Sequence, residues 1–139
     1  MTTKATLEIK GLTELMENIM RAGADIDAAA QRALAKGADI LQAEMDALVP
    51  VGSAADGDPH PGNLKNNITI DGPFQDGNFS YVQVGVVHAD ADTSIYGNVI
   101  EYGSRNRRAQ SYIRRAIDNK RAAAMRAIRE SLKAEGLAD

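Results

Sequence analysis

Residues 26–48 read IDAAAQRALAKGADILQAEMDAL and carry one apolar stripe along their whole length. The stripe has the spacing of an amphipathic helix and consists of Ile26, Ala29, Ala30, Ala33, Leu34, Gly37, Ile40, Leu41, Met45 and Leu48. A helix of this length spans roughly 35 Å. Gly37 lies on the stripe although glycine costs about 1 kcal/mol against alanine there, so we expect close backbone packing. Pro50 disfavours helical geometry at Val49 and ends the element.

The elements around this helix are predicted to be short. Leu7 and Ile9 alternate with polar residues, which indicates a strand, and residues 12–19 have helical spacing. Residues 51–63 hold three Gly and two Pro and are expected to form a flexible loop. Two strands follow, at 68–70 and 81–87, and the turn residues between them favour an antiparallel pair. We expect the first of these strands to end at Asp71-Gly72-Pro73.

The last third of the chain is predicted to end in a helix. Residues 88–95 form a polar connection, and residues 96–103 have a pattern that suits a short helix or a strand. A helix begins at about Tyr112, and its end is expected to fray from about residue 133 to residue 139. The sequence therefore predicts a single α+β domain over 1–139. A long N-terminal helix packs on a small antiparallel sheet, and a C-terminal helix follows.

The composition is that of a folded domain and excludes several kinds of chemistry. Of the 139 residues, 44% are hydrophobic and 25% are charged, which is typical of globular proteins. Cysteine is absent, which excludes disulfides, cysteine nucleophiles and thiolate metal sites. No apolar run approaches the roughly 20 residues of a membrane span. The first residues lack the apolar core of a signal peptide, so we expect the chain to stay in the cytosol until lysis.

Neither an enzyme nor a cofactor is expected, because the catalytic and metal motifs are missing or incomplete. His60 and His88 stand in no metal-binding pattern, and an alternating Asp56, Asp58 and His60 is a weak cation site. Residues 90–101 place acidic and polar groups at calcium-loop positions. The sixth position of such a loop needs glycine for a sharp turn, yet it is Ile95.

Charge is distributed unevenly along the chain. Residues 1–50 hold five basic and eight acidic groups, 51–104 hold one and seven, and 105–139 hold ten and four. Five arginines crowd into eleven residues without an acidic neighbour: Arg105, Arg107, Arg108, Arg114 and Arg115. Three interpretations of this cluster are possible. It is a solvated surface that neutralises the acidic body, a surface that faces DNA, or a surface that docks on an acidic partner.

Five blocks in order resemble the tail-completion, or head–tail joining, proteins of long-tailed bacteriophages. They are IKGLTEL at 9–15, the helix end ALVP at 47–50, PGNLKNNI at 61–68, YGNVIEYGS at 96–104 and AQSYIRRA at 109–116. Together they cover residues 7 to about 120. Ser111 and Arg115 stand where the family has prolines, so the entry to the last helix is less rigidly fixed here.

The resemblance implies a structural virion protein at the neck of the phage. By family analogy it forms a ring of six copies that completes the tail and joins it to the filled head. The implied partners are itself, the head connector, and tail-tube or tail-terminator proteins. The resemblance also implies that the protein contacts DNA only during its passage, that it contacts no membrane, and that it assembles in the host cytoplasm. The fold-specifying residues of the blocks are Pro50, Gly62, Leu64, Ile68, Tyr96, Glu101 and Gly103. The alternative is a small nucleic-acid-binding module that uses the basic C-terminal segment.

Overall fold

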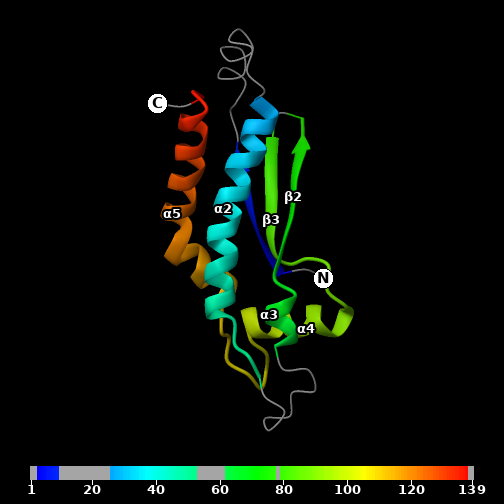
Figure 1. The fold of residues 1–139 in the computed structure, drawn as a ribbon. Helices are drawn as coiled ribbons and strands as arrows, with labels where there is room; N and C mark the ends of the chain where they lie inside the picture. Colours follow the sequence, from blue (N-terminus) through cyan, green and yellow to red (C-terminus); the bar gives the residue numbers. More distant parts are fainter. Residues whose placement is uncertain (1–2, 10–25, 53–61, 78, 138–139) are drawn as a thin grey trace.

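The computed structural model describes residues 3–9, 26–52, 62–77 and 79–137. These residues form β1 (Thr3–Ile9), α2 (Ile26–Leu48), α3 (Asn63–Asn66), β2 (Thr69–Asp76), β3 (Phe79–Val86), α4 (Ala91–Tyr102) and α5 (Tyr112–Ala134). Figure 1 shows α2 and α5 side by side along the sheet, with α3 and α4 at its lower end. The predicted α+β class is confirmed. The helix expected at 12–19, most of the 51–63 loop and the Asp56–His60 site lie outside the described residues.

β3 is the central strand of a three-stranded antiparallel sheet, with β1 on one side and β2 on the other. Val82, Val84 and Val86 point to one face of β3 and are buried, as the alternation of a half-buried strand requires. The register places Leu7 and Ala5 of β1 opposite Val82 and Val84. The covered face of the sheet is therefore aliphatic across its strands.

β2 is longer than the sequence predicts. Its pairing with β3 shifts register after Asp71, resumes at Phe74 and continues to Asp76, so the expected end at Asp71-Gly72-Pro73 is wrong. The strand absorbs Gly72 and Pro73 as a bulge. Proline is tolerated because β2 is an edge strand, where the missing N–H deprives no neighbour of a hydrogen bond.

The long helix predicted at 26–48 is confirmed at both ends and packs on all three strands. Its largest helical contact is with α5. At Gly37 a Cβ atom would lie 2.9 Å from two carbons of the Ile128 side chain. The glycine on the apolar stripe thus permits the close packing that its position predicts.

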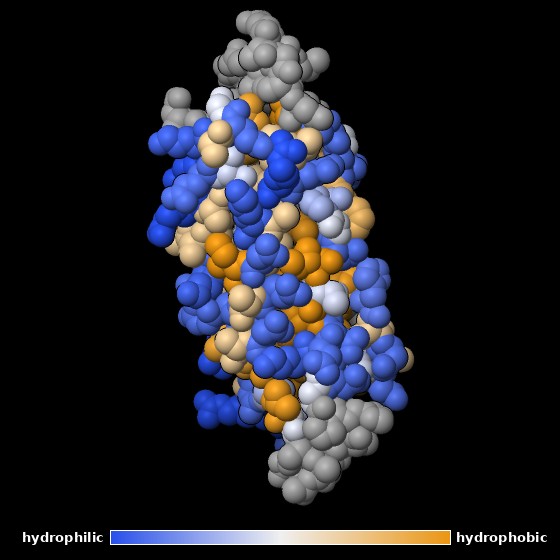
Figure 2. Space-filling view, in the orientation of Figure 1, coloured by the Kyte–Doolittle hydropathy of each residue, from blue (hydrophilic) through white to orange (hydrophobic). Residues whose placement is uncertain are grey.

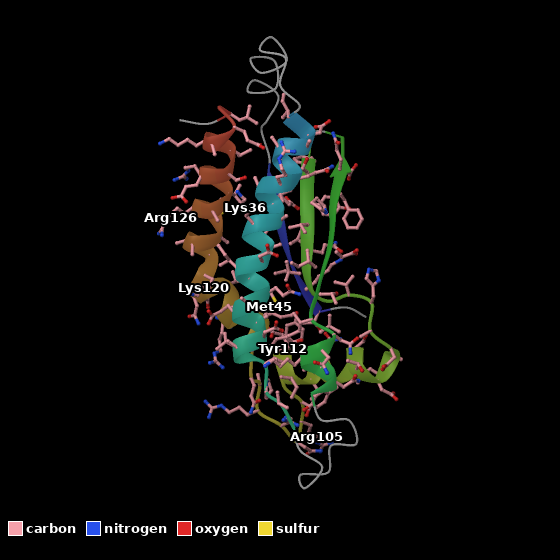
Figure 3. All side chains as sticks on the ribbon, in the orientation of Figure 1. Lys36, Met45, Arg105, Tyr112, Lys120 and Arg126 are labelled. Carbon is pink, nitrogen blue, oxygen red and sulfur yellow. The ribbon has the colours of Figure 1, made fainter. Side chains whose placement is uncertain are left out.

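The buried hydrophobic side chains form two clusters, a main core and a smaller cluster at the start of α2. The main core includes Leu34, Met45 and Tyr112, of which Figure 3 labels the last two. At the other end, Leu137 is 4% exposed and packs with Ile26 at the start of α2. It reaches this position because α5 ends in a Schellman-type turn, in which Leu137 N–H donates to the Leu132 carbonyl at 2.9 Å. Fraying was expected from about residue 133, whereas α5 continues to Ala134.

The segment at 96–103, for which the sequence allows a helix or a strand, belongs almost entirely to α4. This helix begins at Ala91, so most of the polar connection expected at 88–95 belongs to it. Asp90 caps its start, because the carboxylate accepts Thr93 N–H at 2.8 Å. The apolar pattern alone misses this first turn, since its residues are polar and its signal is the cap.

Candidate functional site

The five arginines lie in a basic segment, defined here as residues 104–115, that joins α4 to α5 and includes the first turn of α5. All five are exposed. Figure 3 places Arg105 at the lower end of the molecule. Within the described residues, none of the five forms an ion pair with a carboxylate. Their charge is therefore presented to the surroundings and is not neutralised by the chain described.

The end of α4 holds the basic segment in place. The last carbonyls of a helix lack partners within it, and three of them here each accept a hydrogen bond of 2.7 Å. The pairs are Gly103 N–H to Val99, Gln110 N–H to Ile100 and the Ser111 hydroxyl to Glu101. The segment is thus fixed at its start and at its end.

The side chain of Glu101 also links α4 to α5. It reaches the start of α5, where one carboxylate oxygen accepts Ile113 N–H at 2.8 Å and the other accepts Arg114 N–H at 3.0 Å. Glu101 is only 5% exposed, and Ser111 at the N-cap position forms no side-chain capping bond. A buried carboxylate therefore caps α5 and also complements the positive end of its dipole.

The middle of the basic segment is a tight turn. Ser104 N–H donates to the Arg107 carbonyl at 2.8 Å, and Arg107 N–H returns a bond of 3.3 Å. Gly103, with φ of 80°, precedes the turn, and a Cβ there would lie 2.9 Å from the Ala109 nitrogen. The Arg107 guanidinium lies 5.8 Å from the centroid of the Tyr96 ring, within cation–π range. The arginines are carried by a defined backbone.

The other residues of the family blocks lie in or beside the core. Leu64 and Ile68 are 3% and 4% exposed. Gly62 precedes α3 with φ of 81°, a conformation that favours glycine. Pro50 follows the end of α2, and Tyr96 is half-buried on α4.

The acidic groups of the calcium-loop pattern do not converge. Asp90 caps one end of α4, whereas Glu101 lies at the other end and caps α5. His88 pairs with Asp71 at 3.1 Å. Within the described residues, no three His, Asp or Glu side chains form a group that could hold a metal ion.

Two titratable groups near the segment and core have shifted pKa values. Burial, with smaller contributions from Glu101 and Tyr102, raises the pKa of Tyr112 above its ordinary value. The Tyr112 hydroxyl is buried and finds no hydrogen-bond partner among the described residues. Burial also raises the pKa of Asp46, and the charge of Lys65 opposes that shift.

Sequence reasoning missed the capping role of Glu101. No local signal reveals this role, because the N–H groups that Glu101 binds lie twelve and thirteen residues away. It also missed a groove beside β1 whose lining comes from three separate elements, which no local pattern can reveal.

These features define a small α+β domain that presents a fixed basic surface. A family model described as "Bacteriophage HK97-gp10, putative tail-component" matches residues 13–103, so the chain belongs to this HK97-gp10-like family. The match agrees with the resemblance to phage tail-completion proteins and supports a structural role in the virion. It ends at Gly103, immediately before the basic segment.

Searches of curated proteins and of solved structures gave no match. No helix in the described part of the chain is long and apolar enough to cross a membrane.

Proposed function

We propose that this tail component acts at the head–tail junction, where a ring of copies completes the tail and lets it join the filled head. The family match over residues 13–103 supports a tail component, and the ordered blocks support the junction. The observation that carries the proposal is the basic segment, which is exposed yet fixed by Glu101 and the α4 carbonyls. A preformed charged surface loses little conformational entropy when it docks.

In this function the basic segment docks on the acidic region of a neighbouring copy. Residues 51–104 hold seven acidic groups and one basic group, which complements the five arginines. A lumen that bound DNA strongly would impede ejection, so contact with DNA is limited to its passage. The remaining partners are the head connector and the tail-tube or tail-terminator proteins. Assembly takes place in the host cytoplasm, and no catalysis or cofactor is involved.

The direct test is complementation of a phage or prophage that lacks this gene. Without the protein, we expect lysates to contain DNA-filled heads and separate tails in electron micrographs. Purified protein added to such a lysate should join them and restore plaque-forming particles. Joined particles in the absence of the protein would contradict the proposal. Lysates without tails would also contradict it, because they would assign the protein an earlier step.

A nucleic-acid-binding module is the second candidate, favoured by the five arginines that lack ion pairs within the described residues. Such a module would retain DNA in a salt-dependent manner as an isolated protein, because Lys and Arg release counterions from phosphates. Retention at physiological salt, together with failure to join heads and tails, would favour this candidate.

A further inference from the structure

The two long sides of the domain carry opposite charge. α5, on one side, holds seven Lys and Arg and two Asp and Glu. Residues 69–102, which form β2, β3 and α4, hold five Asp and Glu and no Lys or Arg. Figure 1 shows α5 and β2 on opposite sides of the molecule, with α2 between them. We call these sides the α5 flank, which includes the edge of β1, and the β2 flank, which includes the start of α4.

Most of these charges reach the surface, and hydrophilic residues cover most of the face shown in Figure 2. On the β2 flank, Asp76, Asp90 and Asp92 are exposed, whereas Glu101 is buried at the far end of α4. On the α5 flank, Arg121 and Arg126 are exposed, and Figure 3 shows Arg126 pointing away from the domain. Opposite flanks therefore attract, and like flanks repel.

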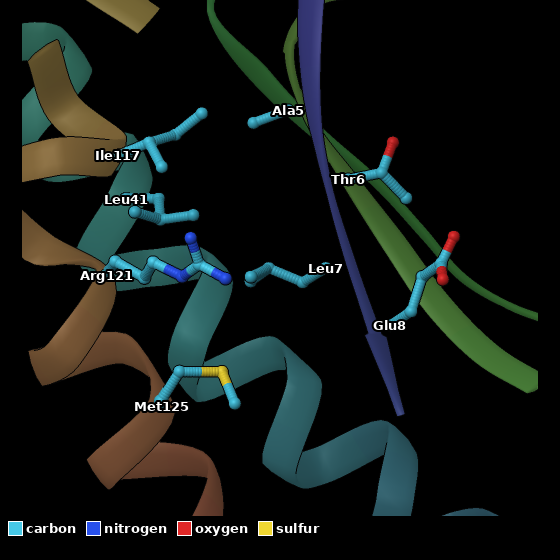
Figure 4. Close-up of a pocket in the computed structure, with 8 residues that line it drawn as sticks. All are labelled: Ala5, Thr6, Leu7, Glu8, Leu41, Ile117, Arg121 and Met125. Carbon is cyan, nitrogen blue, oxygen red and sulfur yellow. The ribbon is translucent and has the colours of Figure 1, made fainter. Parts of the chain in front are cut away.

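The α5 flank also contains a groove, shown in Figure 4. It encloses about 380 Å³ between β1 and α5, and its apolar lining includes Leu7, Leu41, Ile117 and Met125, with Arg121 reaching across it. The groove exists because α5 packs mainly on α2 and, among the strands, chiefly contacts edge strand β1. Two helices, each about 10 Å wide, cover about 20 Å, whereas three strands spaced about 4.8 Å apart cover about 14 Å, so α5 overhangs the sheet.

The β2 flank offers a side chain that suits this groove. Phe74 is 38% exposed on edge strand β2, and its ring lies 5.3 Å from that of Tyr81. Asp76 follows two residues later and is exposed. In the groove, Met125 is 46% exposed and lies one helical turn from Arg121. Each flank thus presents one apolar side chain near one charged side chain, and the two charges have opposite sign.

We propose that the β2 flank of one copy docks on the α5 flank of the next, with Phe74 entering the groove between β1 and α5. The inference rests on the proposed function, because it names the surfaces through which copies of the chain meet. Contact between unlike flanks is heterologous, and a heterologous contact closes into a ring when its rotation permits. A two-fold dimer through two α5 flanks would instead bring two basic helices together. The bulge at Gly72-Pro73 interrupts the β2 edge, so side chains and not a continuous sheet make the contact.

The absence of cysteine allows a direct test by crosslinking. Phe74→Cys and Met125→Cys each introduce one exposed thiol, and the two thiols lie on opposite flanks of one copy. With a short thiol-specific crosslinker, the double variant should give a ladder of covalent oligomers. A mixture of the two single variants should give dimers only, and each single variant alone should give almost none. The ladder should weaken in 1 M salt, since salt screens the charges that align the flanks.

Lys36→Cys combined with Phe74→Cys is the matched control, because Lys36 is exposed on α2 and belongs to neither flank. A ladder as strong in this control would mean random collision and would overturn the proposal. Dimers from Met125→Cys alone would show contact between like flanks, and crosslinks in assembled particles to another tail protein would assign the groove to that protein. Either result overturns the proposal, as does no crosslink at any concentration. If these tests fail while the protein still joins heads to tails, the flank contact is wrong and the proposed function stands. A ladder without joining would reject only the proposed function.

Discussion

Gly37 of α2 and Ile128 of α5 are so close that a methyl group on Gly37 would come within 2.9 Å of the isoleucine side chain. Because Gly37 costs helix stability and yet permits this approach, its contribution is to packing and not to helix formation.

Gly37→Ala is expected to lower the free energy of unfolding by about 1 kcal/mol. An alanine improves helix propensity by about 1 kcal/mol, but overpacking a core costs about 1–3 kcal/mol. Urea denaturation followed by circular dichroism measures the difference. Lys36→Ala on the exposed side of α2 is the control and should change little. A Gly37→Ala protein more stable than wild type would mean that α2 and α5 separate without cost.

Glu101→Ala should destabilise the domain by about 2 kcal/mol, because it leaves two N–H groups at the start of α5 without their acceptor. Glu101→Gln keeps one acceptor oxygen and should lose about half as much. Equilibrium unfolding in urea gives both values. Glu130→Gln, at an exposed site on the same helix, should stay within about 0.5 kcal/mol of wild type. Equal stability of Glu101→Ala and wild type would disprove the capping role.

Tyr112→Phe should increase stability at pH 7 by about 1 kcal/mol, since it removes a buried hydroxyl without a partner among the described residues. Burial raises the folded-state pKa of Tyr112 above the ordinary value of 10.0, so the unfolded chain ionises first as pH rises. Ionisation of Tyr112 therefore leaves the free energy of unfolding unchanged below pH 10 and lowers it progressively above pH 10.

The Tyr112→Phe variant should accordingly lose less stability than wild type between pH 9 and pH 11. Urea denaturation at several pH values in this range measures the two slopes. Parallel slopes for the two proteins would contradict the shifted pKa, and a large loss of stability at pH 7 would indicate an unseen hydrogen-bond partner for the hydroxyl.

Replacing Arg105, Arg107 and Arg108 with Ser should give a folded, soluble protein that assembles less well. We expect about a tenfold higher protein concentration for half-assembly, about 1.4 kcal/mol, because three charges are lost from the docking surface. The salt dependence of assembly, followed by light scattering, should also become weaker. Lys36→Ser is the control, since Lys36 is exposed on α2, outside both the basic segment and residues 51–104. If the triple variant assembles like wild type at every ionic strength, the docking role of the segment is wrong.

The sequence predicts the long helix well because its apolar stripe is both long and strictly periodic. It predicts β2 less well, since a bulge at an edge strand uses the same Gly-Pro signal as a turn. The start of α4 is missed for a related reason: Asp90 marks it through a cap and not through apolar spacing.

The candidate site is only partly readable from the sequence. The arginines are evident as a local run, and their exposure follows from their chemistry. The buried carboxylate of Glu101 is not evident, because its partners are main-chain groups twelve and thirteen residues away. The groove between β1 and α5 cannot be predicted from a local sequence pattern, because it depends on the relative widths of the helix layer and the sheet.

The pairing of α2 with α5 also bears on how the chain folds. The apolar stripe of α2 is synthesised before β2 and β3, and α5, its largest helical partner, is synthesised after both strands. The contacts between α2 and α5 must wait until α5 is synthesised, which slows folding and leaves part of α2 exposed to aggregation meanwhile. A nascent chain cut short before α5 would lack the helix that covers one side of this stripe, so we expect such a chain to be a chaperone substrate.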